Sequence, residues 1–491
     1  MGRAAACGLA LLMIAASCLR PGRSAFTPAT AGTTPSARSG PASLEVAWVN
    51  DQLRPIGQPE TVGAFAVGIV SAPDRKLLLV GLDPATGRAL WQQPLTPSAV
   101  TPGVSVVVTH IGKDKVAYLR PTSVDSGYAE LVLADAATGA DVAKTPEALF
   151  TSTPYPCGGG EDVCATSTTV GATQSVAHRL EAATGRYVVE GDRVPPGARL
   201  IAGGGLFDLG DRPGNTLALL RDGEVVWRTP VSAAFPPGFT TDHGWNWNRF
   251  REEHVFVGSV GGPIVFDGPL KITRDLASTS ATAALSEIDG SVLWRDGSSS
   301  FHCHLVTGDQ PVRCRWRGTV KADNDVITSF QDIDVTIEGF DVRTGRTTWA
   351  VPMGGETSLV AGDARPPIAG ATQVVLEAPA GPIVLDFATG KVSPPLAGAT
   401  FWCTSDQRYE FSQGYQFPGQ PVRHLRPGGV LAAVCDAHAQ PATALPSTAA
   451  TAAIGAHLGN YLLVAVKDGG AGVERFVGFR LSPGPADASA R

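Results

Sequence analysis

The side chains of this chain that could do chemistry include a set of six cysteines that follow Cys18. They form three pairs of near neighbours in the sequence: Cys157 with Cys164, Cys303 with Cys314, and Cys403 with Cys435. An even number in an exported chain favours disulfides, although their connectivity cannot be deduced from the sequence alone. Cys303 lies between His302 and His304, but no Cys-x-x-Cys spacing of a zinc site occurs. We therefore expect structural disulfides and no metal site.

The sequence shows no coherent catalytic set. It has no Gly-x-Ser-x-Gly nucleophile motif, and the isolated histidines His110, His178 and His424 have no nucleophile or carboxylate grouped with them. The acidic segments 323–325 and 332–334 lack the spaced oxygens, the glycine and the terminal glutamate of a calcium loop. We predict no catalytic residue.

Two segments rich in aromatic and charged residues are candidate binding surfaces. Tryptophan, tyrosine and arginine often anchor interfaces, because they bury a large area and keep a polar end. The alternative for the first segment is that its tryptophans pack within the fold. The candidates are His243, Trp245, Trp247 and Arg249 in the first segment, and Arg408, Tyr409 and Tyr415 in the second, which lies between Cys403 and Cys435.

A repeated phrase marks the elements that must position these side chains. An acidic residue, two variable residues, threonine and glycine recur in five copies, which end at Gly87, Gly139, Gly185, Gly345 and Gly390; shorter copies end at Gly223 and Gly290. Each full copy lies between two short β-prone runs, which predicts a strand, a turn and a strand. The acid can accept backbone N–H bonds across the turn, and the glycine can adopt the left-handed conformation. The interval from Gly223 to Gly290 is the longest and holds the first aromatic segment, which we expect to be a loop.

A tryptophan stands four residues after the turn glycine in four copies, at Trp91, Trp227, Trp294 and Trp349. The even offset keeps the ring on one face of the outgoing strand. We therefore expect the same large ring to recur between neighbouring sheets and to supply a shared core.

The phrase resembles the repeat of the pyrroloquinoline-quinone-like propellers, over roughly residues 45–482. This superfamily holds quinoprotein alcohol dehydrogenases and the scaffold lipoprotein of the outer-membrane β-barrel assembly machinery. The resemblance implies an all-β chain that forms a single β-propeller of four-stranded blades. We expect eight blades, with seven as the alternative, because the pattern decays beyond Gly390. Residues 44–49 should pair with the strand near 477–481 and close the ring.

The resemblance also bears on cofactors. Quinoprotein enzymes of this superfamily carry a vicinal disulfide beside the quinone, and no two cysteines are adjacent here. We therefore expect no cofactor and no pyrroloquinoline quinone, since a protein must bind the group that does the chemistry.

The amino terminus predicts export. Residues 1–18 read as a signal peptide, and the segment from Ala15 to Cys18 resembles a bacterial lipobox, with Cys18 as the lipidated residue; the alternative is a plain cleaved signal. Residues 19–43 are rich in Ser, Thr, Pro, Ala and Gly, which predicts a disordered tether. Residues 44–482 are assigned to the propeller and 483–491 to a C-terminal tail.

Composition limits the classes of partner. Charged residues make up 17% of the chain and the net charge is −6, so nothing provides the basic surface that nucleic acids need. The resulting hypothesis is a monomeric, lipid-anchored, non-catalytic binding or scaffold module at the outer face of the cytoplasmic membrane or in the cell wall. Its partner would be an envelope protein, a glycan or a small ligand. The alternatives are a quinone- or metal-dependent oxidoreductase and an extracytoplasmic ligand sensor.

Overall fold

The computed structural model consists almost entirely of β-strands. It describes residues 43–73, 76–96, 108–122, 127–157, 160–169, 175–189, 198–202, 205–210, 215–221, 224–262, 271–305, 310–323, 326–361, 365–411, 424–446, 454–467 and 474–482. The helical segments in these ranges are short: α2 (Val231–Ala234), α3 (Thr357–Ala361) and the 3-10 turns η3 (Leu276–Ser278) and η4 (His302–His304). None of the described helices has the length and apolar character needed to cross a membrane.

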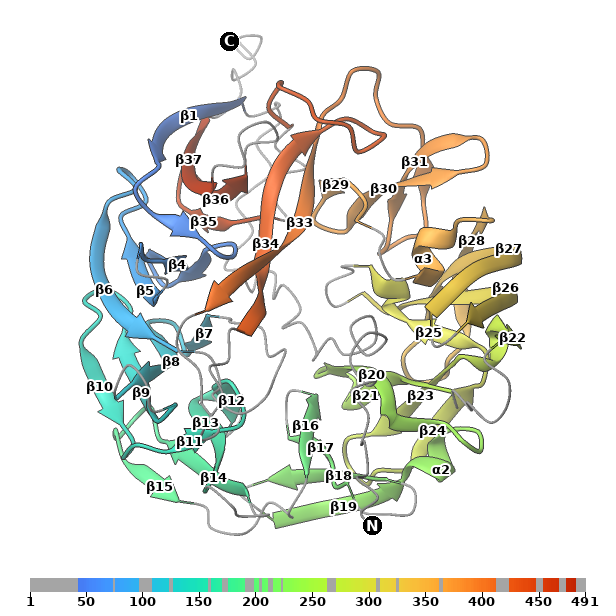
Figure 1. Cartoon of the computed structure of the whole chain (residues 1–491), viewed down its shortest axis with the longest axis horizontal. Coiled ribbons are helices and arrows are strands. Elements are labelled where there is room, and N and C mark those ends of the chain that lie inside the picture. Colours follow the sequence, from blue (N-terminus) through green and yellow to red (C-terminus); the bar gives the residue numbers. More distant parts are fainter. Residues whose placement is uncertain are drawn as a thin grey trace, which may run out of the picture.

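The described strands form seven sheets that follow one another around a common centre (Figure 1). The first sheet holds β2 (Arg54–Pro55), β3 (Glu60–Val62), β4 (Phe65–Ser71), β5 (Leu77–Leu82) and β6 (Ala89–Leu95). The second holds β7 (Thr109–Ile111), β8 (Lys115–Pro121), β9 (Ala129–Asp135) and β10 (Asp141–Lys144). The third holds β11 (Leu149–Phe150), β12 (Tyr155–Cys157), β13 (Asp162–Thr168), β14 (Ser175–Leu180) and β15 (Tyr187–Val189).

The next three sheets continue the series along the chain. The fourth holds β16 (Arg199–Ala202), β17 (Leu206–Asp208), β18 (Thr216–Arg221) and β19 (Glu224–Pro230). The fifth holds β20 (Thr240–Phe250), β21 (Val255–Gly261), β23 (Ser280–Ser286) and β24 (Val292–Asp296). The sixth holds β22 (Lys271–Asp275), β25 (Ser299–Phe301), β26 (Val312–Asp323), β27 (Val326–Phe340) and β28 (Thr347–Gly354).

The seventh sheet has ten strands and contains both ends of the described chain. Its strands are β29 (Ile368–Gly370), β30 (Gln373–Ala378), β31 (Gly381–Asp386), β32 (Val392–Ser393), β33 (Phe401–Phe411), β34 (His424–Cys435), β35 (Ala456–Leu458), β36 (Tyr461–Lys467), β37 (Glu474–Ser482) and β1 (Ser43–Asn50). β1 pairs antiparallel with β37, with Leu44 opposite Leu481 and Val49 opposite Val477. The predicted pairing of the two ends is therefore confirmed.

The repeated phrase forms the turn that enters the outer strand of a sheet. In the second sheet, the Gly139 N–H donates to the Asp135 carbonyl oxygen over 2.8 Å, and Asp135 Oδ1 accepts from the Thr138 N–H over 2.9 Å. Gly139 has a φ of 67°, in the left-handed region that favours glycine. Asp341 and Asp386 accept the equivalent bonds. The turn chemistry predicted from the sequence is confirmed.

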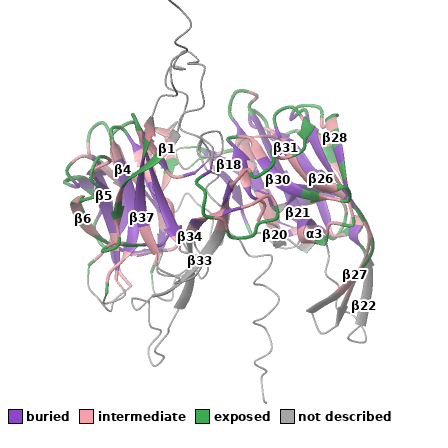
Figure 2. Ribbon diagram, turned by 90° about the horizontal axis from the view of Figure 1, so that it is seen from above, coloured by how far each residue is buried: buried purple, intermediate pink, exposed green. Residues whose placement is uncertain are grey.

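The tryptophans of the outer strands pack against the next sheet along the chain. A Cβ added at Gly139 would come within 2.7 Å of the Trp91 ring, and Trp91 Nε1 donates to the Ala136 carbonyl over 2.9 Å. The same donation joins Trp48 to Pro84 and Trp294 to Val342. Glycine is required because any side chain would displace the ring. The predicted recurrence of this ring between neighbouring sheets is confirmed, and the core lies between sheets (Figure 2).

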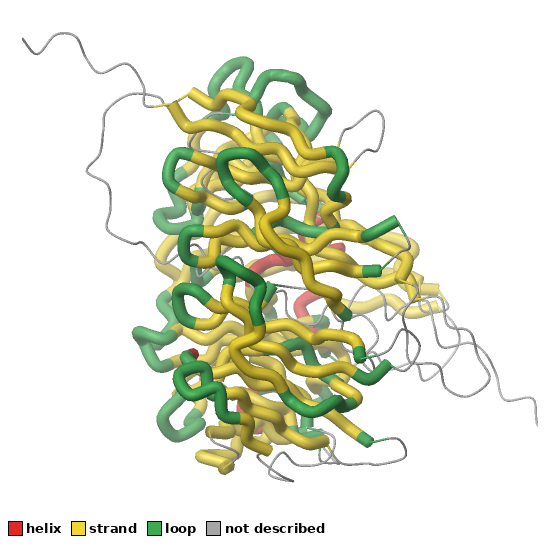
Figure 3. The backbone as a smooth tube through the Cα atoms, turned by 90° about the vertical axis from the view of Figure 1, so that its left-hand side faces the viewer, coloured by secondary structure: helices red, strands yellow, loops and turns green. Residues whose placement is uncertain are grey.

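The longest interval of the repeat does not form the expected loop. Residues 240–250 form β20, a strand of the fifth sheet that pairs antiparallel with β21. The same interval supplies β22, which pairs with β26 of the sixth sheet. In the second aromatic segment, residues 401–411 and 424–435 form the hairpin of β33 and β34. Strands make up most of the described chain, and loops connect them (Figure 3).

Candidate binding surface around Arg249

β20 places Trp245, Trp247 and Arg249 on one face of the strand, opposite Val260, Gly258 and Phe256 of β21. Trp247 is only 4% exposed, and its ring meets that of Phe235 edge-on at 5.9 Å between centroids. A Cβ at Gly258 would collide with the indole, so the missing side chain makes room for it. The proposed surface role of Trp247 is therefore wrong, and the packing alternative describes it. Trp245 is half-buried against the same core.

The remaining sequence candidates are placed only in part. The backbone of His243 belongs to β20, and those of Arg408 and Tyr409 belong to β33, but their side chains lie outside the described part of the structure. Tyr415 and Cys18 also lie outside the described residues. Among the candidates, Arg249 is therefore the one charged side chain whose surroundings the structure describes.

Arg249 binds a buried carboxylate at the junction of the fourth and fifth sheets. Its Nε donates to Glu287 Oε2 over 2.9 Å and its Nη2 to Oε1 over 2.5 Å. Arg221 Nη2, at the end of β18, donates to the same Oε1 over 2.6 Å. The Glu287 side chain is 1% exposed. Burial opposes its ionisation, but the hydrogen bonds and charges of the two guanidinium groups outweigh burial and lower the pKa of Glu287.

Sequence reasoning missed Arg221 and Glu287. Glu287 occupies the turn position that holds Pro84, Ala136, Ala182, Val342 and Phe387 in the full copies, which are all apolar. An acidic residue at that position was the available signal. Arg221 carried no comparable signal, because it approaches Glu287 only through the packing of two sheets.

A serine, a histidine and a tyrosine meet inside the third sheet. Ser167 Oγ and His178 Nε2 are 2.5 Å apart, and His178 Nδ1 is 2.9 Å from the Tyr187 hydroxyl. Ser167 and His178 are 4% and 6% exposed. Burial lowers the pKa of His178 to about 4, so the imidazole is neutral near pH 7. The hydroxyl of Tyr187 takes the place that a carboxylate has in a catalytic triad, and we interpret the group as a hydrogen-bonded core cluster.

The innermost strands carry a second charged pair. His110 on β7 lies with Nδ1 3.5 Å from Glu60 Oε2 on β3, and both side chains are half-buried. A hydrogen bond with Glu60 raises the pKa of His110 against the opposing effect of burial. The histidine that is isolated in the sequence thus faces a carboxylate of the neighbouring sheet.

The structure joins the six cysteines in the three pairs expected from the sequence: Cys157–Cys164, Cys303–Cys314 and Cys403–Cys435. Cys303 is thus held in a disulfide and does not offer a zinc ion a free thiolate. Within the described ranges, no three side chains of the types that bind metals come together.

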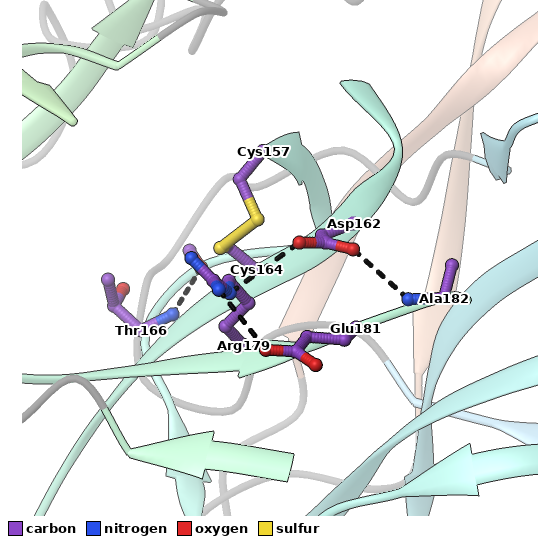
Figure 4. The surroundings of a disulfide bond; sticks show 8 residues. Cys157, Asp162, Cys164, Thr166, Arg179, Glu181 and Ala182 are labelled. Atoms are coloured by element: carbon purple, nitrogen blue, oxygen red, sulfur yellow. Dashed lines mark hydrogen bonds and ion pairs between the residues drawn. A yellow bond between two sulfur atoms is a disulfide. The ribbon is translucent and has the colours of Figure 1, made fainter. Parts of the chain in front are cut away.

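The first disulfide lies beside a small charged network (Figure 4). Arg179 has Nε 3.5 Å from Asp162 Oδ2 and Nη2 3.3 Å from Glu181 Oε1. Asp162 Oδ1 also accepts from the Ala182 N–H over 3.1 Å. The network connects the strand that carries Cys164 with the turn phrase of the third sheet, so we assign the disulfide and its neighbours a structural role.

Comparison with known proteins gives one family match and several similar solved structures. The family model described as outer membrane protein assembly factor BamB matches residues 75–238 and 217–400. No curated protein sequence matches significantly. Among solved structures, BamB from Moraxella catarrhalis is 11% identical, covers 90% of this chain and 99% of its own, and has a TM-score of 0.31. The quinohemoprotein alcohol dehydrogenase from Comamonas testosteroni is 14% identical, covers 89% and 76%, and has a TM-score of 0.35.

Proposed function

Because the chain belongs to the family described as outer membrane protein assembly factor BamB, we propose that it is an exported β-propeller that binds or scaffolds other molecules in the bacterial cell envelope. The match of the family model to both halves of the region 75–400 is the observation that carries this proposal. The partner class would be an envelope protein, with a glycan or a small ligand as further candidates.

Export is supported by the three disulfides, since such bonds persist in oxidising compartments. We propose that residues 1–18 direct the chain out of the cytoplasm and that Cys18 carries a lipid. The chain would then be held as a monomer at the outer face of the cytoplasmic membrane or in the cell wall. Residues 19–43 would link the anchor to β1.

A binding role without catalysis is favoured by how the described charged side chains are used. Arg249 and Arg221 bind Glu287, and Arg313 and Arg315 bind Asp296 and Glu338 within the sixth sheet and its neighbour. Ser167, whose hydroxyl contacts a histidine ring, is only 4% exposed. We likewise propose no quinone, because the six disulfide-forming cysteines pair over separations of 7, 11 and 32 residues and none pairs with an adjacent cysteine.

We infer that the ring has eight blades. Six sheets would each be one blade, and the ten-stranded sheet would hold two: β29 to β32, and β35, β36, β37 and β1. Support comes from the few backbone pairs that link these halves to the intervening hairpin, Ile368 with Trp402 and Ala432 with Val466. The pair of β1 and β37 would then complete the last blade.

The proposal is tested by following the full chain in a bacterial host that produces it. We expect the chain in the membrane fraction, a Cys18→Ser variant released into the exported soluble fraction, and a thiol-reactive polymer to label none of the six paired cysteines before reduction. The same tagged chain should retain envelope proteins after cross-linking. A cytoplasmic chain with six reactive thiols would contradict export, and a chain that retains nothing would contradict the binding role.

A further inference from the structure

We propose that Arg221 and Arg249 form a binding site for a carboxylate group of a partner, with buried Glu287 as the residue that positions both guanidinium groups. This inference rests on the proposed binding function and deepens it by naming the chemistry that the surface recognises. The site lies at the junction of the fourth and fifth sheets.

Hydrogen bonds hold the backbone of Glu287 as well as its side chain. Its carbonyl accepts from Trp227 Nε1 over 2.9 Å, and its N–H donates to the carbonyl of His254 over 2.8 Å. Trp227 is itself buried in the core between these sheets. These bonds fix the backbone from which the carboxylate extends, and the buried carboxylate contacts both arginines at once.

The two arginines retain donors beyond those that Glu287 uses. The bonds to Glu287 occupy Nε and Nη2 of Arg249 and Nη2 of Arg221, which leaves Nη1 of both residues and Nε of Arg221 outside these bonds. The Arg221 side chain is 54% exposed and the Arg249 side chain 24% exposed. A guanidinium group whose orientation is already fixed loses little freedom when it binds an oxoanion, and its planar donors match a carboxylate.

Charge decides which oxoanion fits. One carboxylate faces two guanidinium groups, so the three side chains carry a formal charge of about +1. His254 Nδ1, 4.0 Å from Glu287 Oε2, adds to this when protonated. Glu252 and Glu253, in the turn before His254, reduce the wider field but make no ion pair with either arginine within 4.0 Å. A singly charged carboxylate balances the site, whereas a doubly charged phosphate would exceed it.

The carboxylate could belong to a small molecule or to an acidic side chain of a peptide, and two probes separate these sources. We would titrate the full chain, at low ionic strength, with acetate, which carries one negative charge, and with a blocked peptide that contains a single glutamate between glycines. The variants are Arg221→Gln, which leaves the bidentate bond of Arg249 to Glu287, and Arg228→Gln, an exposed arginine of β19 as the control of equal charge change.

We expect at least one probe to bind the parent chain and the Arg228→Gln variant equally, and the Arg221→Gln variant at least about fivefold more weakly, while a cooperative thermal transition shows that this variant is still folded. Binding of the peptide alone would identify a protein source, and binding of both probes a small carboxylate. The proposal is overturned if neither probe binds, or if the two variants lose the same affinity. If the proposal fails in either way but the Arg221→Gln variant still retains envelope proteins after cross-linking, the proposed binding function is unaffected.

Discussion

At the scale of single residues, the buried histidines tie the stability of the fold to pH. His178 bonds to Ser167 and Tyr187 as a neutral ring, and burial lowers its pKa to about 4. His302 is also buried, and burial lowers its pKa to about 3. The unfolded chain binds protons on both rings near pH 6.5, before the folded chain does. Protonation therefore favours unfolding as the pH falls from about 6.5 toward 4.

Replacement of His178 by Gln tests this linkage. Between pH 6.5 and pH 4 we expect the parent chain to lose up to about 3 kcal/mol of unfolding free energy through this histidine, because a shift of one pKa unit corresponds to about 1.4 kcal/mol. The variant should start less stable at pH 7 and show a shallower dependence over that interval. Denaturant unfolding at several pH values measures both. An unchanged slope would show that His178 titrates normally in the folded chain.

Trp247 offers a second test at this scale, because two interpretations of the aromatic segment depend on it. A buried tryptophan that packs on Phe235 and Gly258 should cost about 3–5 kcal/mol when replaced by Ala and much less when replaced by Phe. Thermal unfolding compares the two variants. Equal and small losses would mean that the ring contributes little to the core and would reopen a surface role.

At the scale of elements, four of the five full turn phrases serve two sheets at once: those that end at Gly87, Gly139, Gly345 and Gly390. The acid and glycine of such a phrase close the turn of one sheet, and the glycine also forms a flat seat for the tryptophan of the preceding sheet. Gly345 shows both demands: its φ is 68°, and a Cβ there would come within 2.6 Å of the Trp294 ring. The indole N–H of Trp294 then bonds to the carbonyl of Val342. The turn is thus part of the interface between sheets.

The two demands can be separated with matched glycine variants. Gly112 has a φ of 60° but nothing within 4 Å of an added Cβ. The Gly112→Ala variant should therefore lose about 1–2 kcal/mol of unfolding free energy, which is the cost of the left-handed backbone. The Gly345→Ala variant should lose about 1–3 kcal/mol more, because the Trp294 ring must also move. Chemical denaturation of both variants checks the difference. Equal losses would show that the Trp294 ring adjusts freely.

At the scale of the whole molecule, the amino-terminal strand β1 is the edge strand of the last described sheet. β1 pairs along its length with β37, and its Trp48 donates to the Pro84 carbonyl of the first sheet. Asn50 Nδ2 also donates to the Gly87 carbonyl over 2.8 Å. One short strand therefore joins the end of the chain to its beginning, because it pairs within the seventh sheet and bonds to the first.

Removal of β1 should consequently weaken the molecule far from the cut. We expect a chain that starts at residue 51 to unfold at a lower temperature than a control that starts at residue 43, and to exchange the backbone amides of β37 faster. The shorter chain should also self-associate, because it exposes the edge of β37. Calorimetry, hydrogen exchange and sedimentation measure these effects. Matching behaviour of the two chains would mean that β1 adds nothing to the stability of the ring.

Sequence alone determined the features that are encoded within a few residues. The acid, threonine and glycine of a turn bond to one another, and the tryptophan follows its glycine at a constant offset. The even number of cysteines predicted disulfides, and the structure then decided which cysteines pair. The pairing of the ends was also predictable, because residues 44–49 resemble an outer strand without a partner. The turn and the tryptophan offset follow short-range rules of backbone geometry, so they can be predicted before any packing is known, whereas the pairing of the ends followed from the resemblance to a closed ring.

The tertiary structure decided which side chains meet across sheets. Glu287 gathers Arg249 and Arg221 from 38 and 66 residues away, and Trp247 turns from a candidate surface residue into part of the core. The interval expected to be a loop became β20 and β22, because its residues complete sheets whose other strands lie elsewhere in the chain. Burial and charge pairing depend on the arrangement of all sheets together, and no local pattern of residues contains that information.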